Sequence, residues 1–189
     1  MLDKSLVDLI LQKKDDAFTV FYNMIVDHFY NYLKSNFSLS ESDIHDIISN
    51  TFIKIWNNLD SFDKKKWNFT SWVWTILRNT TKDFFKKKNE YVFSDFDFSD
   101  KDGDVTSIEE FLEDDNNYND VLENDYQLEQ ISEAIKNLKL SERELLFLRY
   151  TEWKSLKEIA QIVGLTETNV RVKIHRLLGK LKKYLNWKK

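Results

Sequence analysis

Residues 156–176 read LKEIAQIVGLTETNVRVKIHR, and this stretch decides the fold of the second half of the chain. Its first part places Ile159, Ala160 and Val163 at the three- and four-residue steps of a buried helix face. Gly164 then permits a tight turn, because glycine adopts backbone angles that other residues avoid. The stretch therefore predicts a helix, a turn and a second helix, which is the arrangement of a helix-turn-helix domain.

The second helix of this stretch begins with a cap and has two contrasting faces. Thr166 is a suitable N-cap, since its hydroxyl can accept a hydrogen bond from the first turn. The inward face holds Val170 and Ile174, and the outward face suits the major groove, where arginine pairs with guanine and valine touches thymine methyls. The predicted duplex-DNA contacts are Thr166, Thr168, Arg171, Val172, His175, Arg176 and Lys180. The alternative is a helical hairpin with a merely basic surface.

Helix breakers are scarce along the whole chain, which contains no proline and three glycines. Apolar residues recur with helical periodicity, so the sequence predicts an all-α fold. The 189 residues are enough for two small helical domains, 1–89 and 126–189, joined by a flexible acidic linker at 90–125. The predicted helices span residues 2–13, 15–36, 40–59, 71–87, 128–138, 141–152, 155–163 and 167–185.

Charge is distributed unevenly along the chain. The whole sequence has a formal net charge of −4, whereas residues 90–125 contain 14 acidic residues and one basic residue. This segment therefore carries −13, and the rest of the chain carries +9. Residues 61–89 hold eight Lys or Arg against two Asp, and residues 171–189 hold eight against none. Two basic regions on either side of an acidic middle indicate contact with nucleic acid.

The composition disfavours several classes of function. The chain has no cysteine, and its histidines, His28, His45 and His175, form no pair at metal-ligand spacing, so we expect no metal and no other cofactor. The carboxylates of the predicted linker lack the rigid setting that an enzyme needs, so we expect no catalytic residues. No apolar run could span a membrane and no signal peptide is evident, which predicts a soluble, cytoplasmic protein.

The segment 40–59 has one apolar face and one polar face. The apolar residues recur at helical spacing and predict a core helix; they are Ile44, Ile47, Ile48, Ile55, Trp56 and Leu59. Almost opposite lies a polar stripe that contains one isoleucine, made of Asp46, Asn50, Ile53 and Asn57. An apolar residue within a polar stripe suggests a docking surface for another helix, although single exposed isoleucines are also ordinary on protein surfaces.

The segment 61–88 combines lysines with three tryptophans, Trp67, Trp72 and Trp74. Cations neutralise a nucleic-acid backbone and large aromatic rings stack on unpaired bases, so this combination suits single-stranded nucleic acid. The alternative is a solvated face whose tryptophans are tucked into the core. The predicted contacts are Lys64, Lys66, Trp67, Asn68, Phe69, Trp72, Arg78, Asn79 and Lys82.

Four segments in this order resemble the extracytoplasmic-function (ECF) class of RNA polymerase sigma factors. Each motif is weak alone, whereas the ordered set is specific, and the resemblance covers nearly the whole chain outside the linker. The segments are KDDAF at 14–18 followed by Phe21 and Tyr22, HDIISNTF at 45–52 followed by Trp56, FTSW at 69–72 leading to Arg78 and Asn79, and LKLSER at 138–143 leading through LRY at 148–150 to residues 156–176.

The resemblance implies a non-enzymatic initiation factor that recruits core RNA polymerase to promoters. The stripe on the segment 40–59 would bind the clamp helices of the polymerase, and the flap would be a further polymerase contact. Residues 61–89 would recognise and melt the minus-ten element, and the helix-turn-helix would read the minus-thirty-five element. An anti-sigma factor is a further partner that the resemblance suggests. The rival reading is a helix-turn-helix regulator that binds duplex DNA without polymerase.

The chain departs from the family pattern at informative positions. Ser49 and Asn50 stand where the family usually has Gln and Glu, so the polymerase contact should depend less on charge and more on Asp46 and Ile53. Val172 stands where a small or polar residue is common between two basic positions of the recognition helix. Its presence argues against transferring a promoter sequence from a relative.

Overall fold

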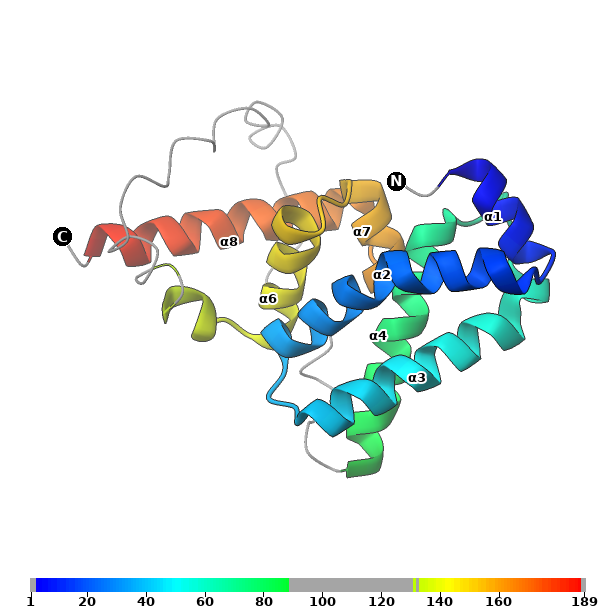
Figure 1. Ribbon diagram of the computed structural model, residues 1–189. Coiled ribbons are helices and arrows are strands. Elements are labelled where there is room, and N and C mark those ends of the chain that lie inside the picture. Colours follow the sequence, from blue (N-terminus) through cyan, green and yellow to red (C-terminus); the bar gives the residue numbers. More distant parts are fainter. Residues whose placement is uncertain (1–2, 89–130, 132, 188–189) are drawn as a thin grey trace.

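The computed structural model describes residues 3–88, 131 and 133–187, and side chains as far as residue 184. Within these residues the regular structure is helical and contains no strand, as the sequence predicted (Figure 1). The predicted acidic linker at 90–125 lies outside the described residues. In chain order the elements are α1 (Lys4–Leu11), α2 (Asp15–Asn36), α3 (Glu41–Asn58), the 3-10 turn η1 (Leu59–Ser61), α4 (Phe69–Lys88), α6 (Leu140–Leu146), the π-helical turn η4 (Phe147–Thr151), α7 (Leu156–Val163) and α8 (Glu167–Trp187).

The helices α1 to α4 form one bundle, in which α2 and α3 pack together and α4 packs against α3 (Figure 1). Each helix contributes apolar residues to a shared core, including Ile10, Phe21, Ile47 and Leu77, which are all fully buried. The start of α3 is fixed by Ser40, whose Oγ accepts a hydrogen bond from the backbone N–H of Asp43 at 3.2 Å. The core and the cap together explain why the segment around the predicted polar stripe is a rigid helix.

The helices α7 and α8 form the predicted helix-turn-helix. A capping box starts α7, because Ser155 Oγ accepts from the backbone N–H of Glu158 at 3.2 Å while Glu158 Oε2 accepts from the backbone N–H of Ser155 at 2.9 Å. Gly164 ends this helix in the left-handed region, with φ of 76°, and its N–H donates to the carbonyl of Ala160 at 3.0 Å. The turn that the sequence assigned to glycine therefore has the geometry that favours glycine.

Most predicted helix ends lie within about two residues of the observed ones, but one predicted helix is divided into two elements. The segment expected to be a single helix at 141–152 is α6 followed by η4, whose π-helical turn widens the backbone before the chain leaves it. The exit is fixed by two hydrogen bonds, from the N–H of Lys154 to the carbonyl of Leu148 at 2.9 Å and from Arg149 Nη1 to the carbonyl of Lys154 at 3.2 Å. Local periodicity cannot reveal such a widening, because the apolar spacing continues through it.

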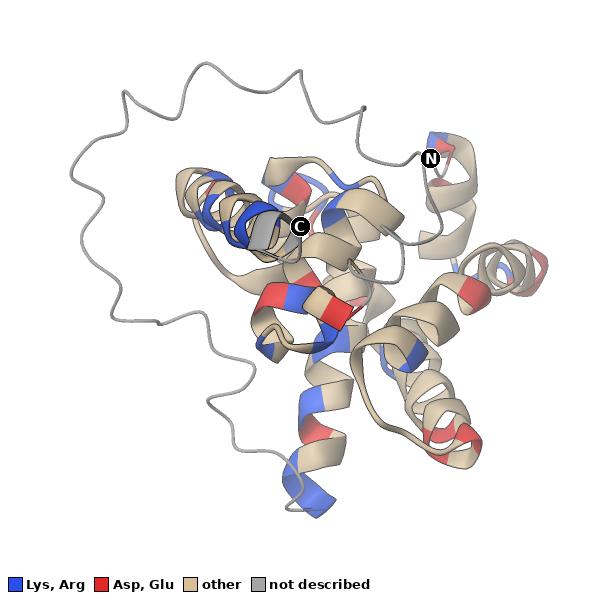
Figure 2. Cartoon of the chain, turned by 90° about the vertical axis from the view of Figure 1, so that its left-hand side faces the viewer, with Lys and Arg blue, Asp and Glu red and all other residues tan. Residues whose placement is uncertain are grey.

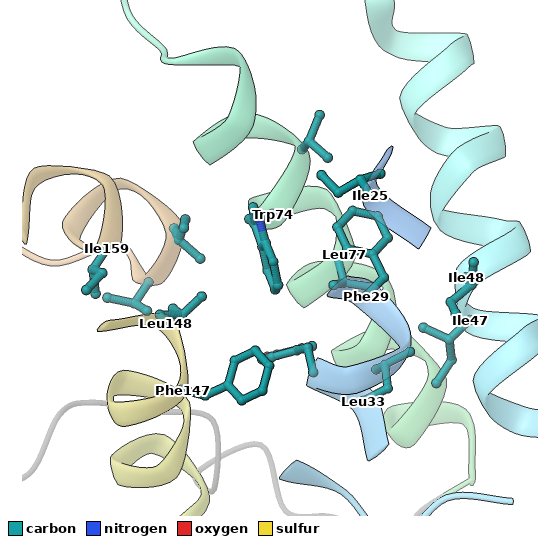
Figure 3. Packing of buried hydrophobic residues seen from close by; sticks show 14 of the residues in the cluster. Ile25, Phe29, Leu33, Ile47, Ile48, Trp74, Leu77, Phe147, Leu148 and Ile159 are labelled. Atoms are coloured by element: carbon teal, nitrogen blue, oxygen red, sulfur yellow. The ribbon is translucent and has the colours of Figure 1, made fainter. Parts of the chain in front are cut away.

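The second domain packs directly on the first. The helix α7 lies against α4, and α6 contacts α2, so the buried apolar residues of both halves form one continuous cluster. Figure 3 shows Trp74 of α4 between Leu77 and Phe29 on one side and Leu148 and Ile159 on the other. The two sequence segments are therefore distinct along the chain and share a core in space.

Candidate nucleic-acid interface

The polar stripe of α3 lies on the surface, where the sequence placed it. Asp46, Asn50, Ile53 and Asn57 are all exposed, and the side chain of Ile53 is 57% exposed although it is large and apolar. The opposite face of α3 is buried in the bundle core. This arrangement leaves the stripe accessible to a partner helix.

Sequence periodicity missed an exposed aromatic residue beside this helix. Tyr22 of α2 is exposed, and its ring lies 4.5 Å from that of Phe52, the residue before Ile53. The contact joins two helices, so the spacing within either helix gives no signal for it. The motif Phe21-Tyr22 contained the residue, but only the packing of α2 on α3 shows where its ring lies.

The loop before α4 carries two exposed lysines and a half-buried tryptophan. Lys64 forms an ion pair with Asp8 and Lys66 lies 3.7 Å from Asp63, and both lysines remain exposed. Trp67 is half-buried. Because exposed ion pairs contribute little free energy, both lysines can exchange these carboxylates for phosphates.

Three of the predicted DNA contacts, Asn68, Phe69 and Trp72, lie at the start of α4, and one of them is buried. Trp72 is half-buried, with its ring 5.1 Å from Phe62 and 5.7 Å from Phe69. Asn68 is exposed, and its Oδ1 accepts the N–H of Thr70 at 2.9 Å, which caps the helix. Phe69 was predicted to contact DNA, and this prediction is wrong for the observed structure. Its ring is buried in the bundle core against Phe62 and Phe21, because its position at the start of α4 points it inward.

Farther along α4 the outer face is less cationic than predicted. Asn79 is exposed and Lys82 is half-buried, as a surface role requires. Arg78 was assigned to the same face, but its side chain is only 6% exposed, and its Nε lies 2.8 Å from Glu144 Oε1 of α6. The prediction that Arg78 contacts DNA is therefore contradicted, because the second domain covers this side of α4.

The start of α8 has the expected cap. Thr166 Oγ1 accepts the backbone N–H of Asn169 at 3.2 Å, and Thr168, His175 and Arg176 are exposed. Arg171 is half-buried, with its Nη2 4.0 Å from Glu167 of the preceding turn. A helix that keeps its polar residues outward next to the turn is the arrangement that a major groove can accept.

Two further predicted DNA contacts on α8, Lys180 and Val172, differ in how far their side chains are exposed. Lys180 is half-buried, and its Nζ lies 3.1 Å from both carboxylate oxygens of Glu142. Val172 was predicted to face the groove, but it is only 3% exposed, so this prediction is wrong. The helix packs against both α6 and α7, and a helix held on two sides buries more than the single apolar stripe that periodicity identifies.

Lysine and arginine residues are concentrated along two helices (Figure 2). They recur along α8, and Lys86, Lys87 and Lys88 end α4.

Among the described residues, no group of three or more His, Cys, Asp or Glu is placed to hold a metal ion. None of the described helices is long and apolar enough to cross a membrane.

Comparison with known protein families gives two matches in the same order as the two domains. Sigma-70 region 2 matches residues 18–91, and sigma-70 region 4 matches residues 128–181. Among individual proteins, the ECF RNA polymerase sigma factor SigW of Bacillus subtilis is 26% identical over 185 residues. That alignment covers 98% of this chain and 97% of SigW.

Two solved structures have a similar fold. CnrH, a sigma factor known from Cupriavidus metallidurans, was solved with the cytosolic domain of CnrY; it matches with a TM-score of 0.65 at 20% identity, over 99% of each chain. RpoE of Bartonella quintana, solved with the anti-sigma factor NepR, matches with a TM-score of 0.59 at 21% identity, over 89% of this chain and 96% of that one. At these identities the likeness establishes the fold alone.

Proposed function

This chain belongs to the sigma-70 family, in its ECF group, and from this membership we propose which of its surfaces bind core RNA polymerase and which bind promoter DNA. It is a promoter-specific sigma factor whose partners are core RNA polymerase and promoter DNA. The observation that carries this function is the ordered pair of regions 2 and 4 on one chain, and the exposed, capped α8 of region 4 supports it. A regulator that acts without polymerase would have no use for region 2.

We propose that the α3 stripe of Asp46, Asn50, Ile53 and Asn57 binds the clamp helices of the polymerase. Its exposure supports this role, and Ile53 supplies an apolar centre surrounded by polar residues, which is the usual anatomy of a protein interface. The flap of the polymerase is proposed as a contact of region 4. Tyr22 is a further candidate at the edge of the clamp contact because its exposed ring packs on Phe52.

The proposed minus-ten surface is the sequence-derived set without its two buried members. Lysines would neutralise the backbone of the unpaired strand, tryptophan would stack on or border a flipped base, and the asparagine amides would read base edges. The half-buried position of Trp72 supports this role, since a ring held by Phe62 and Phe69 is ordered before DNA arrives. The proposed residues are Lys64, Lys66, Trp67, Asn68, Trp72, Asn79 and Lys82.

The proposed minus-thirty-five reader is the outward face of α8. Residues near the capped end would approach base edges, and residues farther along the helix would hold phosphates. The first group is Thr166, Thr168, Arg171 and His175, and the second is Arg176 and Lys180. Arg171 and His175 are four residues apart and therefore lie on one side of the helix.

Sigma factors as a family are not enzymes, and we propose that this chain likewise leaves the chemistry of RNA synthesis to the polymerase. The cytoplasm is its proposed location, because core polymerase and promoter DNA are found there. An anti-sigma factor is a proposed further partner. The resemblance of the fold to CnrH and RpoE, which were solved with CnrY and the anti-sigma factor NepR, motivates this proposal.

Run-off transcription tests the proposed function. Core polymerase is incubated with a library of genomic promoter fragments, with and without this chain. We expect new transcripts from a subset of promoters only when the chain is present. Specific binding to duplex DNA by the chain alone, without any polymerase-dependent transcript, would instead support a polymerase-independent regulator.

A further inference from the structure

Trp153 is the most exposed large apolar residue among those that the structure describes. It lies in the loop between η4 and α7 and is 81% exposed, whereas Ile53, the next in this order, is 57% exposed. Tryptophan is large and highly buried on average, so exposure of its ring leaves a large apolar area in water. The ring is therefore accessible to any partner that approaches this loop.

The backbone at Trp153 is also unfavourable for a side chain. Its φ is 52°, in the left-handed region, and the only other described non-glycine residue with positive φ is Lys13, at 56°. A side chain crowds the following carbonyl in this region, whereas glycine adopts it freely. A glycine at position 153 would keep the loop and relieve the strain, so the fold alone gives no reason for tryptophan here.

The residues on both sides hold this backbone conformation in place. The N–H of Glu152 donates to the carbonyl of Phe147 at 3.0 Å, and the N–H of Lys154 donates to the carbonyl of Leu148 at 2.9 Å. The side chains of Glu152 and Lys154 are only 5% and 14% exposed. Because both neighbours are fixed, the Trp153 ring is held out in solvent by an ordered part of the second domain.

The position of Trp153 along the chain indicates what would cover the ring. It lies two residues before Ser155, the N-cap of α7, which is the first helix of the helix-turn-helix. When a domain of this kind binds DNA, its second helix enters the major groove and its first helix crosses the sugar-phosphate backbone. A loop that leads into the first helix is therefore close to the backbone of the duplex that α8 would read.

The surroundings of the ring favour DNA over a protein partner. Within residues 151–157 the other exposed residues are Thr151, Ser155 and Lys157, two with hydroxyls and one with a positive charge. The centre of a protein interface is depleted of lysine and serine, whereas hydroxyls and lysines are usual donors to phosphates. An exposed tryptophan in this setting fits a phosphate backbone better than the apolar centre of a protein contact.

We propose that Trp153 packs against the sugar-phosphate backbone of the promoter duplex at the edge of the minus-thirty-five element. This inference rests on the proposed sigma function. The indole Nε1–H donates to a phosphate oxygen, and the face of the ring covers a deoxyribose. Since the ring is held outward before DNA arrives, little conformational entropy is lost when the contact forms.

This contact differs from those of the basic residues of α8 in two measurable ways. A backbone contact carries no sequence information, so it strengthens binding to every promoter alike. A neutral indole releases no counterion from DNA, so its contribution does not change with salt, whereas that of a lysine does. Trp153 therefore supplies affinity that is independent of both sequence and salt.

Two substitutions at position 153 and one control test the proposal in the full chain. Trp153→Gly removes the ring and relieves the left-handed strain, so we expect a melting temperature no lower than that of wild type. Trp153→Tyr keeps a ring and a donor to phosphate at the same position. Lys13→Gly is the matched control, because it relieves the same kind of strain in region 2 and loses only an exposed ion pair with Asp60.

Holoenzyme assembled with a saturating amount of each chain is titrated with promoter duplexes that vary in the minus-thirty-five element, at several salt concentrations. We expect Trp153→Gly to weaken binding about five- to tenfold on every promoter, with the salt slope and sequence preference of wild type. Trp153→Tyr should retain most of the wild-type affinity, and Lys13→Gly should bind like wild type. A separate titration of core polymerase should give the same core affinity for all four chains.

Wild-type promoter affinity for Trp153→Gly would overturn the proposal. A loss confined to core affinity would also overturn it and would make the polymerase the partner of the ring. So would a changed minus-thirty-five preference, because the ring would then be reading bases. If the wild-type chain conferred no promoter-specific binding on core polymerase, the sigma function itself would fail, and this inference with it.

Discussion

Glu41 and Glu144 accept hydrogen bonds from the same kinds of donor, a tyrosine hydroxyl and a basic side chain, but in different surroundings. Glu41 accepts from Tyr30 Oη at 2.8 Å and from Lys34 Nζ at 2.5 Å, on the surface of region 2. Glu144 accepts from Tyr32 and Arg78 at the buried contact between regions. The exposed cluster connects two neighbouring helices of region 2, whereas the buried cluster connects the two regions, where removal of one partner would leave a charge buried without its counter-ion.

The largest difference should appear when each carboxylate is removed. Glu144→Ala leaves the Arg78 guanidinium buried without this partner, which costs about 3 to 5 kcal/mol if the domains remain in contact. Because the domains can separate and hydrate the charge, we expect an increased radius of gyration in small-angle X-ray scattering and unchanged helical content in circular dichroism. Glu41→Ala serves as the matched control and should leave the radius unchanged. A compact Glu144→Ala chain would mean that this carboxylate does not hold the domains together.

The two tryptophans of α4 offer a second comparison between buried and accessible side chains. Trp74→Ala should destabilise the chain by about 3 to 5 kcal/mol in urea unfolding, because it removes a large ring from the shared core. Trp72→Ala combined with Asn79→Ala should act mainly on strand opening. We expect reduced permanganate reactivity of minus-ten thymines in the complete transcription complex. Normal reactivity with that double variant would show that these two residues do not hold the open strand.

Two isoleucines on opposite faces of α3 compare an exposed side chain proposed to bind polymerase with a buried side chain of the core. Ile53→Asp places a charge in the proposed polymerase contact and should weaken core binding by about 1 to 3 kcal/mol without unfolding the chain, since the side chain is exposed. Ile47→Asp, on the buried face of the same helix, should unfold region 2 instead. Titration of tagged core polymerase measures the first effect, and thermal unfolding separates it from the second. Unaltered core affinity for Ile53→Asp would exclude this stripe as the docking surface.

Two basic residues of α8 should separate base reading from phosphate binding. Arg171→Ala should cost about 1 to 3 kcal/mol and relax the minus-thirty-five preference, whereas Lys180→Ala should weaken binding to all sequences and reduce the salt slope by about one unit. Holoenzyme is assayed on promoters that share one minus-ten element and vary in the minus-thirty-five element. If Arg171→Ala kept the wild-type preference across that library, α8 would not be reading through this side chain.

The smallest effect concerns the pH dependence of the exposed cluster. Hydrogen bonds from Lys34 and then Tyr30 lower the pKa of Glu41, so its stabilising contribution is present above the ordinary carboxyl pKa and is lost as pH falls through the lowered value. The hydrogen bond with Glu41 raises the pKa of Lys34, so that contribution is lost only as strongly alkaline pH passes the raised value. Thermal unfolding of Glu41→Gln should differ slightly from wild type at neutral pH and low salt. The difference should vanish in acid and in high salt, and a difference that persists in both would contradict an ionic origin.

Several parts of the fold and site could be predicted because they depend on neighbouring residues. The turn at Gly164 and the cap at Thr166 follow from local backbone geometry and local hydrogen bonds, and both are present in the structure. The exposure of Ile53 follows from the angular spacing of one helix whose opposite face is apolar. The family resemblance, which rests on ordered motifs, was confirmed by the matches to sigma-70 regions 2 and 4.

The predictions that were wrong, for Arg78, Val172 and Phe69, depend on contacts between helices and not on neighbouring residues. Periodicity assigns one buried face to each helix, so it placed Arg78 and Val172 outside, whereas α4 and α8 are each covered by more than one neighbour. Phe69 was grouped with the DNA contacts because aromatic residues beside lysines suit unpaired bases, yet its ring fills the core of region 2. In each case the deciding contact comes from another helix.

The sequence by itself determined the helical fold class, the cap at Thr166, the helix-turn-helix and the order of the two functional regions, because periodicity, caps and short motifs depend on residues close together along the chain. Only the tertiary structure decided that Arg78 faces Glu144, a residue 66 positions away along the chain. No local pattern distinguishes a buried arginine from an exposed one on the same helix. Its burial is fixed by which surface of the second domain packs against α4, where the gain from covering apolar residues outweighs the cost of removing two charges from water.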